Sequence, residues 1–313
     1  MMSAGGAVRA AGASGAGPAP HWAGDPPRPT PLYDWRRWWS VALVGFALIA
    51  VATCETSAQS TKPRVPPGRD PGGVAIAYIG PGLDYTWAEI APRLARDGEG
   101  EIIGWDFLDN DRRPYDRCDY HDGLWHGDCA TLRGWQIVKE PGAARLVVVR
   151  ASADKPQTLV QAFGLVAQSP ARIVLLSPTA PSQPAALDPV FLREASQRLP
   201  ALLFVVGTTP GIGLAASAPR PDNVIVVAAT DGAVTDGGAD LGVQVGHLTA
   251  QRNEIAAARV AALAARLLRV EPQLDAVGLK RRILALAEPA PPAMRVSTRH
   301  GWIAEPERHF LPR

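Results

Sequence analysis

The sequence has no strong excess of charge of either sign, and it is poor in cysteine. Its 313 residues include 32 Lys and Arg against 30 Asp and Glu, which gives a net charge of +2. The basic residues are scattered, whereas a nucleic-acid surface needs them concentrated, so nucleic acid is excluded as the expected partner. Three cysteines are too few for a disulfide-dense scaffold. Hydrophobic residues make up 47% of the chain, which is enough for a sizeable core.

An uncharged, mostly apolar run extends over residues 38–54, directly after Arg36 and Arg37. Its length is marginal for a membrane-spanning helix, which needs about 20 residues. It fits a signal-peptide core or a short membrane anchor flanked by Trp38 and Trp39. The two arginines favour a cytoplasmic N-terminus, so we expect the rest of the chain in the periplasm or another extracytoplasmic space, secreted or anchored. The alternative is a buried helix of a soluble protein.

Composition divides the rest of the chain. Residues 1–37 are rich in Ala, Gly and Pro and are predicted to be disordered, and residues 55–71 form a Pro/Gly-rich linker. Residues 72–313 contain no internal repeat and are predicted to form one domain.

In that domain, short apolar runs alternate with segments of helical periodicity. Strands are predicted at 74–79, 101–107, 145–151, 172–177, 201–207 and 223–229. Helices are predicted at 87–95, 158–167, 188–199, 254–268 and 277–288. This alternation predicts an α/β fold with a mostly parallel central sheet and helices on both faces. All the predicted strands except 101–107 are expected to be adjacent and buried.

In such a sheet, functional residues collect at the carboxyl ends of the strands. The segments expected there are 80–82, the His-Gly pair at 126–127, 177–178, 207–209 and the beginning of the helix at 254. The His-Gly pair is expected at a turn-to-helix junction, with His126 beginning the helix.

Several of these segments resemble the subtilisin-like serine peptidases (subtilases) in the order in which that family has them. The resemblance covers residues 74–303 and includes VAIAYIGPGLDYT, GWDFLDNDRRPYD, HGDCATL, IVLLSPTAPS, LLFVVGTTPG, PDNVIVVAATD, VAALAARLLRVEP and TRHGWI. It implies the three-layer subtilisin-like fold. It also implies serine-type proteolysis by an Asp, His and Ser triad with an asparagine for the oxyanion.

When the three triad residues and the oxyanion asparagine of the family are carried over residue by residue, this sequence retains only one of the four. The histidine falls on His126, the aspartate position on Gly80, the oxyanion asparagine on Thr208 and the serine on Glu254. Pro178, where the family binds substrate backbone, has no N–H to donate. Acyl transfer needs a nucleophile activated by an oriented base, so the sequence predicts a catalytically degenerate domain without metal or cofactor.

Two functions remain open at this stage. One is a non-catalytic module that binds or regulates a protein or peptide. The other is a residual or active endopeptidase whose nucleophile has moved to Thr249 or Ser217. In that case Asp84 or Asp106 could orient His126, although both are explained more simply as turn or capping residues.

Two cysteines flank the histidine in the order Cys118, His121, His126, Cys129. In an exported protein a disulfide between them is the expected outcome. Zinc binding by the Cys and His side chains and two free thiols are the alternatives. We also expect Glu254 and His126 to lie within several Å as an ion pair, and membrane contact to be made through residues 38–54.

Overall fold

The computed structural model describes residues 62–121, 124–126, 129–140, 142–177, 189–208, 220–230, 238–245, 252–290 and 298–309. The apolar run at 38–54 lies outside these ranges. Among the described helices, none combines the length and the apolar character that crossing a membrane requires.

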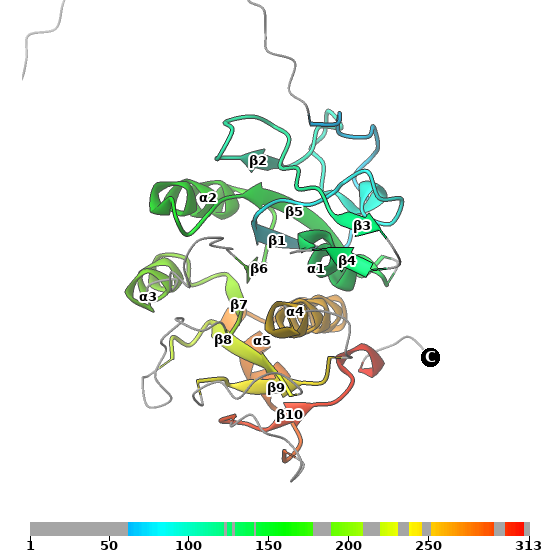
Figure 1. Cartoon of the computed structure of the whole chain (residues 1–313). Coiled ribbons are helices and arrows are strands. Elements are labelled where there is room, and N and C mark those ends of the chain that lie inside the picture. The colour runs from blue at the N-terminus through cyan, green and yellow to red at the C-terminus, as the bar shows by residue number, and fades with distance from the viewer. Residues whose placement is uncertain are drawn as a thin grey trace, which may run out of the picture. The chain divides into compact units, whose positions relative to one another are not determined.

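The core is an eight-stranded sheet with the order β10-β9-β8-β7-β6-β1-β5-β2 (Figure 1). All seven neighbouring pairs are parallel. The strands are β1 (Val74–Gly80), β2 (Gly104–Asp106), β5 (Ala144–Arg150), β6 (Ile173–Leu176), β7 (Leu203–Gly207), β8 (Val224–Ala229), β9 (Leu241–Val243) and β10 (Trp302–Ile303). The five strands predicted to be adjacent do form a continuous block, β8-β7-β6-β1-β5, which confirms that prediction.

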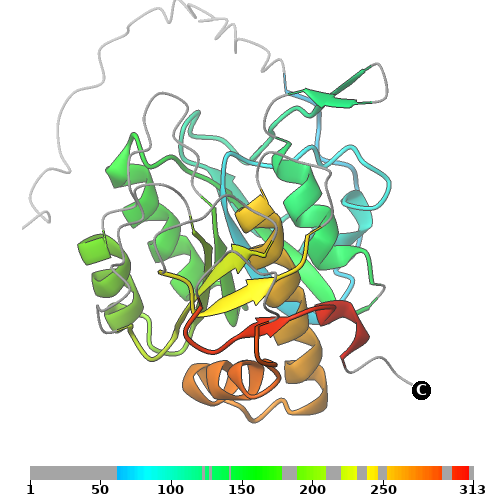
Figure 2. The same ribbon diagram turned by 60° about the horizontal axis from the view of Figure 1, so that its bottom comes forward.

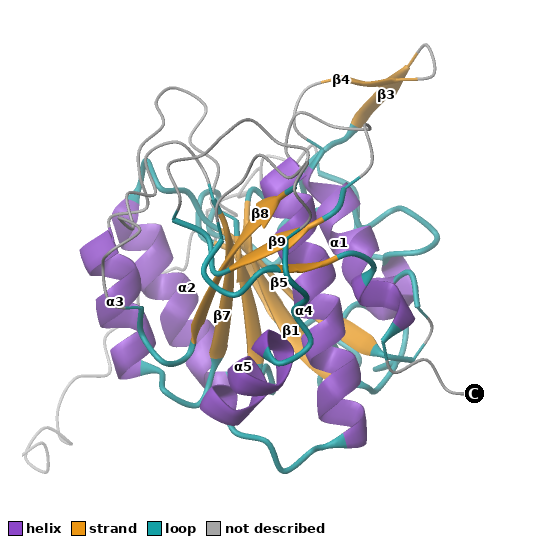
Figure 3. Ribbon diagram, turned by 90° about the horizontal axis from the view of Figure 1, so that it is seen from below, coloured by secondary structure: helices purple, strands orange, loops and turns teal. Residues whose placement is uncertain are grey.

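Helices cover both faces of the sheet (Figure 3). One face carries α1 (Ala130–Val138), α4 (Arg252–Val270) and α5 (Ala276–Leu284), and the other carries α2 (Pro156–Gln168) and α3 (Pro189–Arg198). Successive strand residues point to opposite faces, so Ile76 and Tyr78 pack under α1 and α4 while Ala77 and Ile79 pack under α2. The three-layer α/β architecture is therefore as predicted.

Helix ends follow local signals. Pro156 and Pro189 stand in the first turns of α2 and α3, where a missing N–H costs nothing. The side chain of Asp275 caps α5 by accepting the Gly278 N–H at 2.6 Å. The alanine-rich α4 packs closely on the sheet, and a Cβ on Gly207 would lie only 2.8 Å from the carbonyl carbon of Asn253.

Two predicted elements differ in the structure. The helix expected at 87–95 is a series of turns with one short 3-10 helix, η2 (Ala91–Arg93), because Pro92 cannot donate an N–H and restrains the residue before it. The strand expected at 101–107 is limited to β2, at the edge of the sheet. A second 3-10 helix, η3 (Pro306–Arg308), follows β10, and a two-stranded hairpin, β3 (Asp119–His121) and β4 (Leu124–His126), precedes α1.

Candidate functional site

The carboxyl edge of the sheet brings three of the predicted positions together. Gly80, Ser177 and Thr208 stand at or directly after the ends of β1, β6 and β7, and β6 lies between the other two strands. The beginning of α4 lies against the same edge, since a Cβ on Gly207 would come within 3.0 Å of the backbone nitrogen of Glu254. The described chain therefore places Gly80, Thr208 and the backbone of Glu254 around one region.

The space beside Gly80 is filled. A Cβ at this position would lie 2.6 Å from Tyr78 Oη and 2.8 Å from the Ser177 carbonyl oxygen. Tyr78 is fully buried, and it shares a strand face with Gly80 because the two residues are two positions apart in β1. Real Cβ atoms do not approach so closely, so Tyr78 and the backbone of Ser177, directly after β6, occupy the place where the Cβ of an aspartate would lie.

A buried arginine lies next to this position. Arg133, in the second turn of α1, is 0% exposed, and its Nη1 donates to Ser177 Oγ at 2.7 Å. A buried guanidinium is costly unless its N–H groups are bonded and its charge is compensated. Ser177 Oγ is thus used as an acceptor, and its side chain is 4% exposed. This hydroxyl is held in the interior rather than presented to a substrate.

Asn253 fixes the beginning of α4 to two strands. Its Oδ1 accepts the Ala229 N–H at 2.7 Å, and its Nδ2 donates to the Thr208 carbonyl oxygen at 2.5 Å. Thr208 is 7% exposed, and its Oγ1 has no hydrogen-bond partner in the described structure. Glu254 follows in the first turn of α4, where the helix dipole favours a carboxylate. This arrangement fixes the beginning of α4 against the sheet, next to the buried Thr208.

His126 does not begin a helix, which corrects that expectation. It is the last residue of β4 and pairs with Asp119 across the hairpin, and α1 begins four residues later at Ala130. A covalent bond joins the two chain segments that flank this hairpin. The side chain of His126 lies outside the described part of the structure, so the expected ion pair with Glu254 stays a prediction.

That covalent bond is the predicted disulfide. Cys118 and Cys129 are joined with a Cα–Cα distance of 4.9 Å, across eleven positions of sequence. This confirms the pairing and excludes both the zinc alternative and the free thiols, because bonded sulfurs cannot bind metal as thiolates. In the described residues no group of three or more His, Cys, Asp or Glu side chains has the geometry to hold a metal ion.

The two acids considered as substitutes for the missing aspartate are used locally. Asp84 is buried and accepts the Thr86 N–H at 3.0 Å, as expected for a turn residue. Asp106 is 0% exposed and accepts the backbone N–H groups of Leu108 and Asp109 at 2.8 Å and 3.0 Å. These contacts support the turn and capping roles. The relocated nucleophile positions, Thr249 and Ser217, lie outside the described residues.

Asp106 also belongs to a charged cluster with Asp109, Asp111, Lys62 and Arg150. Lys62 Nζ lies 2.5, 2.7 and 3.2 Å from the three carboxylates, and Arg150 Nη1 lies 2.9 Å from Asp106. Burial lowers the pKa of Lys62, but the hydrogen bonds to the carboxylates outweigh it and raise the pKa above its ordinary value. Arg150 Nε donates to the Pro81 carbonyl oxygen at 2.9 Å, so the cluster adjoins the Gly80 position.

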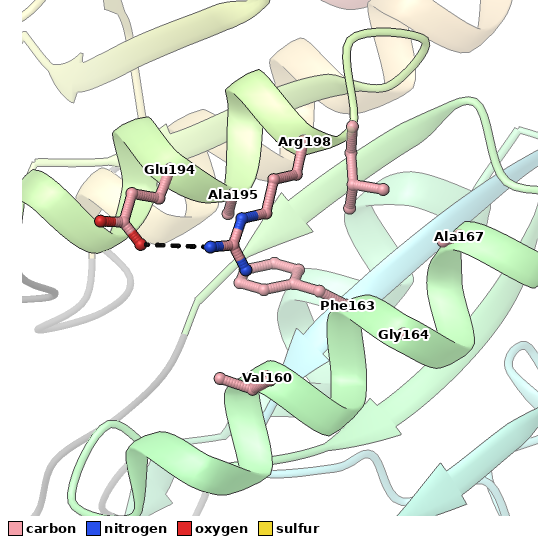
Figure 4. Close-up of a pocket in the computed structure, with 8 residues that line it drawn as sticks. Val160, Phe163, Gly164, Ala167, Glu194, Ala195 and Arg198 are labelled. Atoms are coloured by element: carbon pink, nitrogen blue, oxygen red, sulfur yellow. Dashed lines mark ion pairs between the residues drawn. The ribbon is translucent and has the colours of Figure 1, made fainter. Parts of the chain in front are cut away.

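A hollow of about 340 Å³ lies between α2 and α3, on the sheet face opposite α1 and α4 (Figure 4). Its floor is mainly apolar and includes Phe163 and Leu199. Glu194 and Arg198 form a 4.0 Å ion pair at its rim. Because it opens on the other face of the sheet, it is separate from the candidate site.

Comparison with solved structures identifies the architecture. The chain aligns with a cold adapted subtilisin-like serine proteinase at a TM-score of 0.52 and 17% identity, covering 76% of this chain and 90% of that one. It aligns with a structure of the subtilase cytotoxin SubAB at a TM-score of 0.52 and 16% identity, covering 75% and 88%. The chain has a subtilisin-like fold. No protein-family model matches it, and no curated protein matches it. At these identities the likeness establishes the fold alone.

Three residues of the candidate site region were not found from the sequence. Tyr78 could have been found, because period-two alternation places it on the same face as Gly80. Arg133 stands among apolar residues of α1, and a charged residue on an apolar helix face is a usable signal. Asn253 gave no such signal. The two backbone groups that its side chain bonds, the Ala229 N–H and the Thr208 carbonyl oxygen, are 24 and 45 positions away in the sequence.

Proposed function

We propose that this subtilisin-like domain is catalytically degenerate and that it binds or regulates a protein or peptide, exported to or tethered in an extracytoplasmic compartment. The observation that carries the proposal is the closed state of the Gly80 position, where Tyr78 Oη and the Ser177 carbonyl oxygen take the space of a side chain. A triad histidine needs an acid there to hold its tautomer and to stabilise its charged form.

The other positions support the same proposal. Glu254 stands in the first turn of the helix that would carry a nucleophile, and a carboxylate cannot supply the serine alkoxide that acyl transfer requires. Ser177, which is described and close by, is buried and bonded to Arg133. The Cys118–Cys129 disulfide supports an oxidising compartment, because disulfides persist there and are rare in the cytosol.

The test is digestion of a mixed peptide library by the purified full chain, followed by mass spectrometry. We expect no time-dependent cleavage by the native chain or by the matched variants His126→Ala and Glu254→Ala. Cleavage by the native chain that His126→Ala abolishes would contradict the proposal and establish the alternative, a serine-type endopeptidase with a relocated nucleophile. Cleavage that both variants retain would identify a contaminating peptidase.

A further inference from the structure

The hollow between α2 and α3 has one wall without charge. Figure 2 shows these two helices as neighbours on one side of the sheet, with α4 on the other side. The volume of about 340 Å³ lies in the range of small-ligand pockets, about 300–1,000 Å³. Val160, Phe163, Gly164 and Ala167 line it from α2, and none of the thirteen residues of α2 is charged. This wall therefore suits the apolar part of a ligand.

Part of this wall is exposed although it is apolar. Val160, Gly164 and Ala167 are spaced by four and three positions, which places them on one face of α2, and all three are exposed. Val160 is 49% exposed, whereas most large hydrophobic residues of the described chain are buried. Exposed apolar surface that borders a hollow is typical of a binding site.

The fold does not require glycine at position 164. Gly164 stands in the interior of α2, where glycine is destabilising relative to alanine. A Cβ at this position would meet nothing within 4 Å, and the φ angle lies outside the left-handed region. Neither close packing nor backbone conformation therefore explains this glycine. Its missing side chain leaves the hollow open between the two helices.

The opposite wall supplies a cation. Figure 4 shows the Arg198 side chain extending from α3 toward the Phe163 ring. The distance of 4.0 Å to the Glu194 carboxylate is beyond the hydrogen-bond range, and both side chains are exposed, so this ion pair is weak. The charged residues of α3 are Arg193, Glu194 and Arg198, two positive and one negative. The head group that complements this wall is therefore an anion.

From these features we infer that the hollow binds a compact amphiphile with an apolar body and a single carboxylate. The body lies against Phe163 in the space that Gly164 leaves open. The carboxylate replaces Glu194 as the partner of Arg198, because a guanidinium binds a carboxylate closely through two parallel N–H groups. An extended peptide fits less well, since the backbone groups of two helical walls are bonded within the helices and offer its backbone no partners.

The test is calorimetric titration of the purified full chain with decanoate, below the concentration at which decanoate forms micelles. Decyltrimethylammonium carries the same alkyl chain with the opposite charge and is the matched ligand. We expect saturable binding of decanoate at one site, about tenfold or more tighter than binding of the cation, because a hydrogen bond to a charged group contributes at least this factor.

One pair of variants locates the site. Gly164→Leu places a side chain in the open space, and it should weaken decanoate binding by about tenfold or more, the loss expected when the alkyl chain no longer fits. Leucine favours a helix over glycine, so the Tm should not fall. Gln161→Leu is the matched control, because Gln161 is exposed on α2 and does not line the hollow. It should leave decanoate binding unchanged.

A second pair of variants tests the head group. Arg198→Gln should weaken decanoate binding by about tenfold, through loss of a charged hydrogen bond, and leave binding of the cation unchanged or stronger. Glu194→Gln should strengthen decanoate binding, because it removes the carboxylate that competes for Arg198.

Each remaining outcome overturns part of the inference. Decanoate binding that Gly164→Leu leaves at the native strength would show that the hollow is not the site. Equal binding of decanoate and the cation, or an Arg198→Gln variant that binds decanoate as the native chain does, would overturn the carboxylate assignment. Tighter binding of acetyl-Gly-Gly-Phe, a peptide with a free carboxylate, than of decanoate would show that the ligand is a peptide terminus. Absence of saturable decanoate binding would overturn the inference as a whole.

Discussion

Replacing Gly80 by alanine tests whether the aspartate position is closed. The φ angle of Gly80 lies outside the left-handed region, so alanine meets no backbone strain there. The new Cβ would lie 2.6 Å from Tyr78 Oη and 2.8 Å from the Ser177 carbonyl oxygen, and the second atom is backbone that directly follows β6 and is hydrogen-bonded to β1 through the Ser177 N–H. Overpacking a well-filled core costs about 1–3 kcal/mol. Alanine also restricts the unfolded chain more than glycine does, and this stabilising effect offsets about 0.4–1 kcal/mol of the overpacking cost.

We therefore expect Gly80→Ala to lower the free energy of unfolding by about 1–2 kcal/mol, the overpacking cost less the chain effect. Urea denaturation followed by tryptophan fluorescence measures it. Gly164→Ala is the matched control, because this glycine is exposed in α2 and its new Cβ meets nothing within 4 Å. The control should stabilise the domain by about 0.5–1 kcal/mol through helix propensity. A Gly80→Ala chain as stable as the native one would show that the space beside Gly80 is open.

Three further predictions concern stability. Replacing Cys118 and Cys129 by serine should cost about 2–3 kcal/mol by loop-closure entropy, seen as a lower Tm that reductant does not change further. Arg133→Met should cost about 1.5–3 kcal/mol, because it removes a charged hydrogen bond to Ser177; a Tm equal to that of the native chain would show that the contact contributes nothing. Burial raises the pKa of Glu307, but hydrogen bonds from two cationic side chains outweigh it and lower the pKa to about 2. Its contribution is therefore full above pH 4.5 and is lost as the pH falls toward 2, so Glu307→Gln should flatten the acid side of the stability profile, and an unchanged profile would contradict this.

The sheet could be predicted because its strands are buried on both faces. Runs such as VAIAYI and IVLL are apolar throughout, as strands buried on both faces are, and a parallel arrangement follows from the helices between them. The prediction of a helix at 87–95 was wrong. The spacing of its apolar residues fits a helix, but Pro92 interrupts the backbone hydrogen bonds.

The site was less predictable because its contacts join distant parts of the chain. The position of Glu254 at the beginning of α4 follows from helix periodicity, but the hydrogen bonds of Asn253 to β7 and β8 do not. The hairpin that carries His126 consists of two three-residue strands, which are too short to be recognised from their composition, and the bond between Cys118 and Cys129 flanks it. The sequence prediction placed Lys62 in a linker, because its acidic partners are 44 to 49 residues away along the chain.

A catalytically degenerate domain holds no activated nucleophile, and a fluorophosphonate probe reports whether one is present. The probe forms a covalent adduct with an activated serine or threonine, and the intact mass of the full chain records it. We expect the mass to stay unchanged after long incubation with the probe. A single adduct that forms on the native chain and not on the heat-denatured chain would contradict it, and peptide mapping to Thr249 or Ser217 would identify the relocated nucleophile.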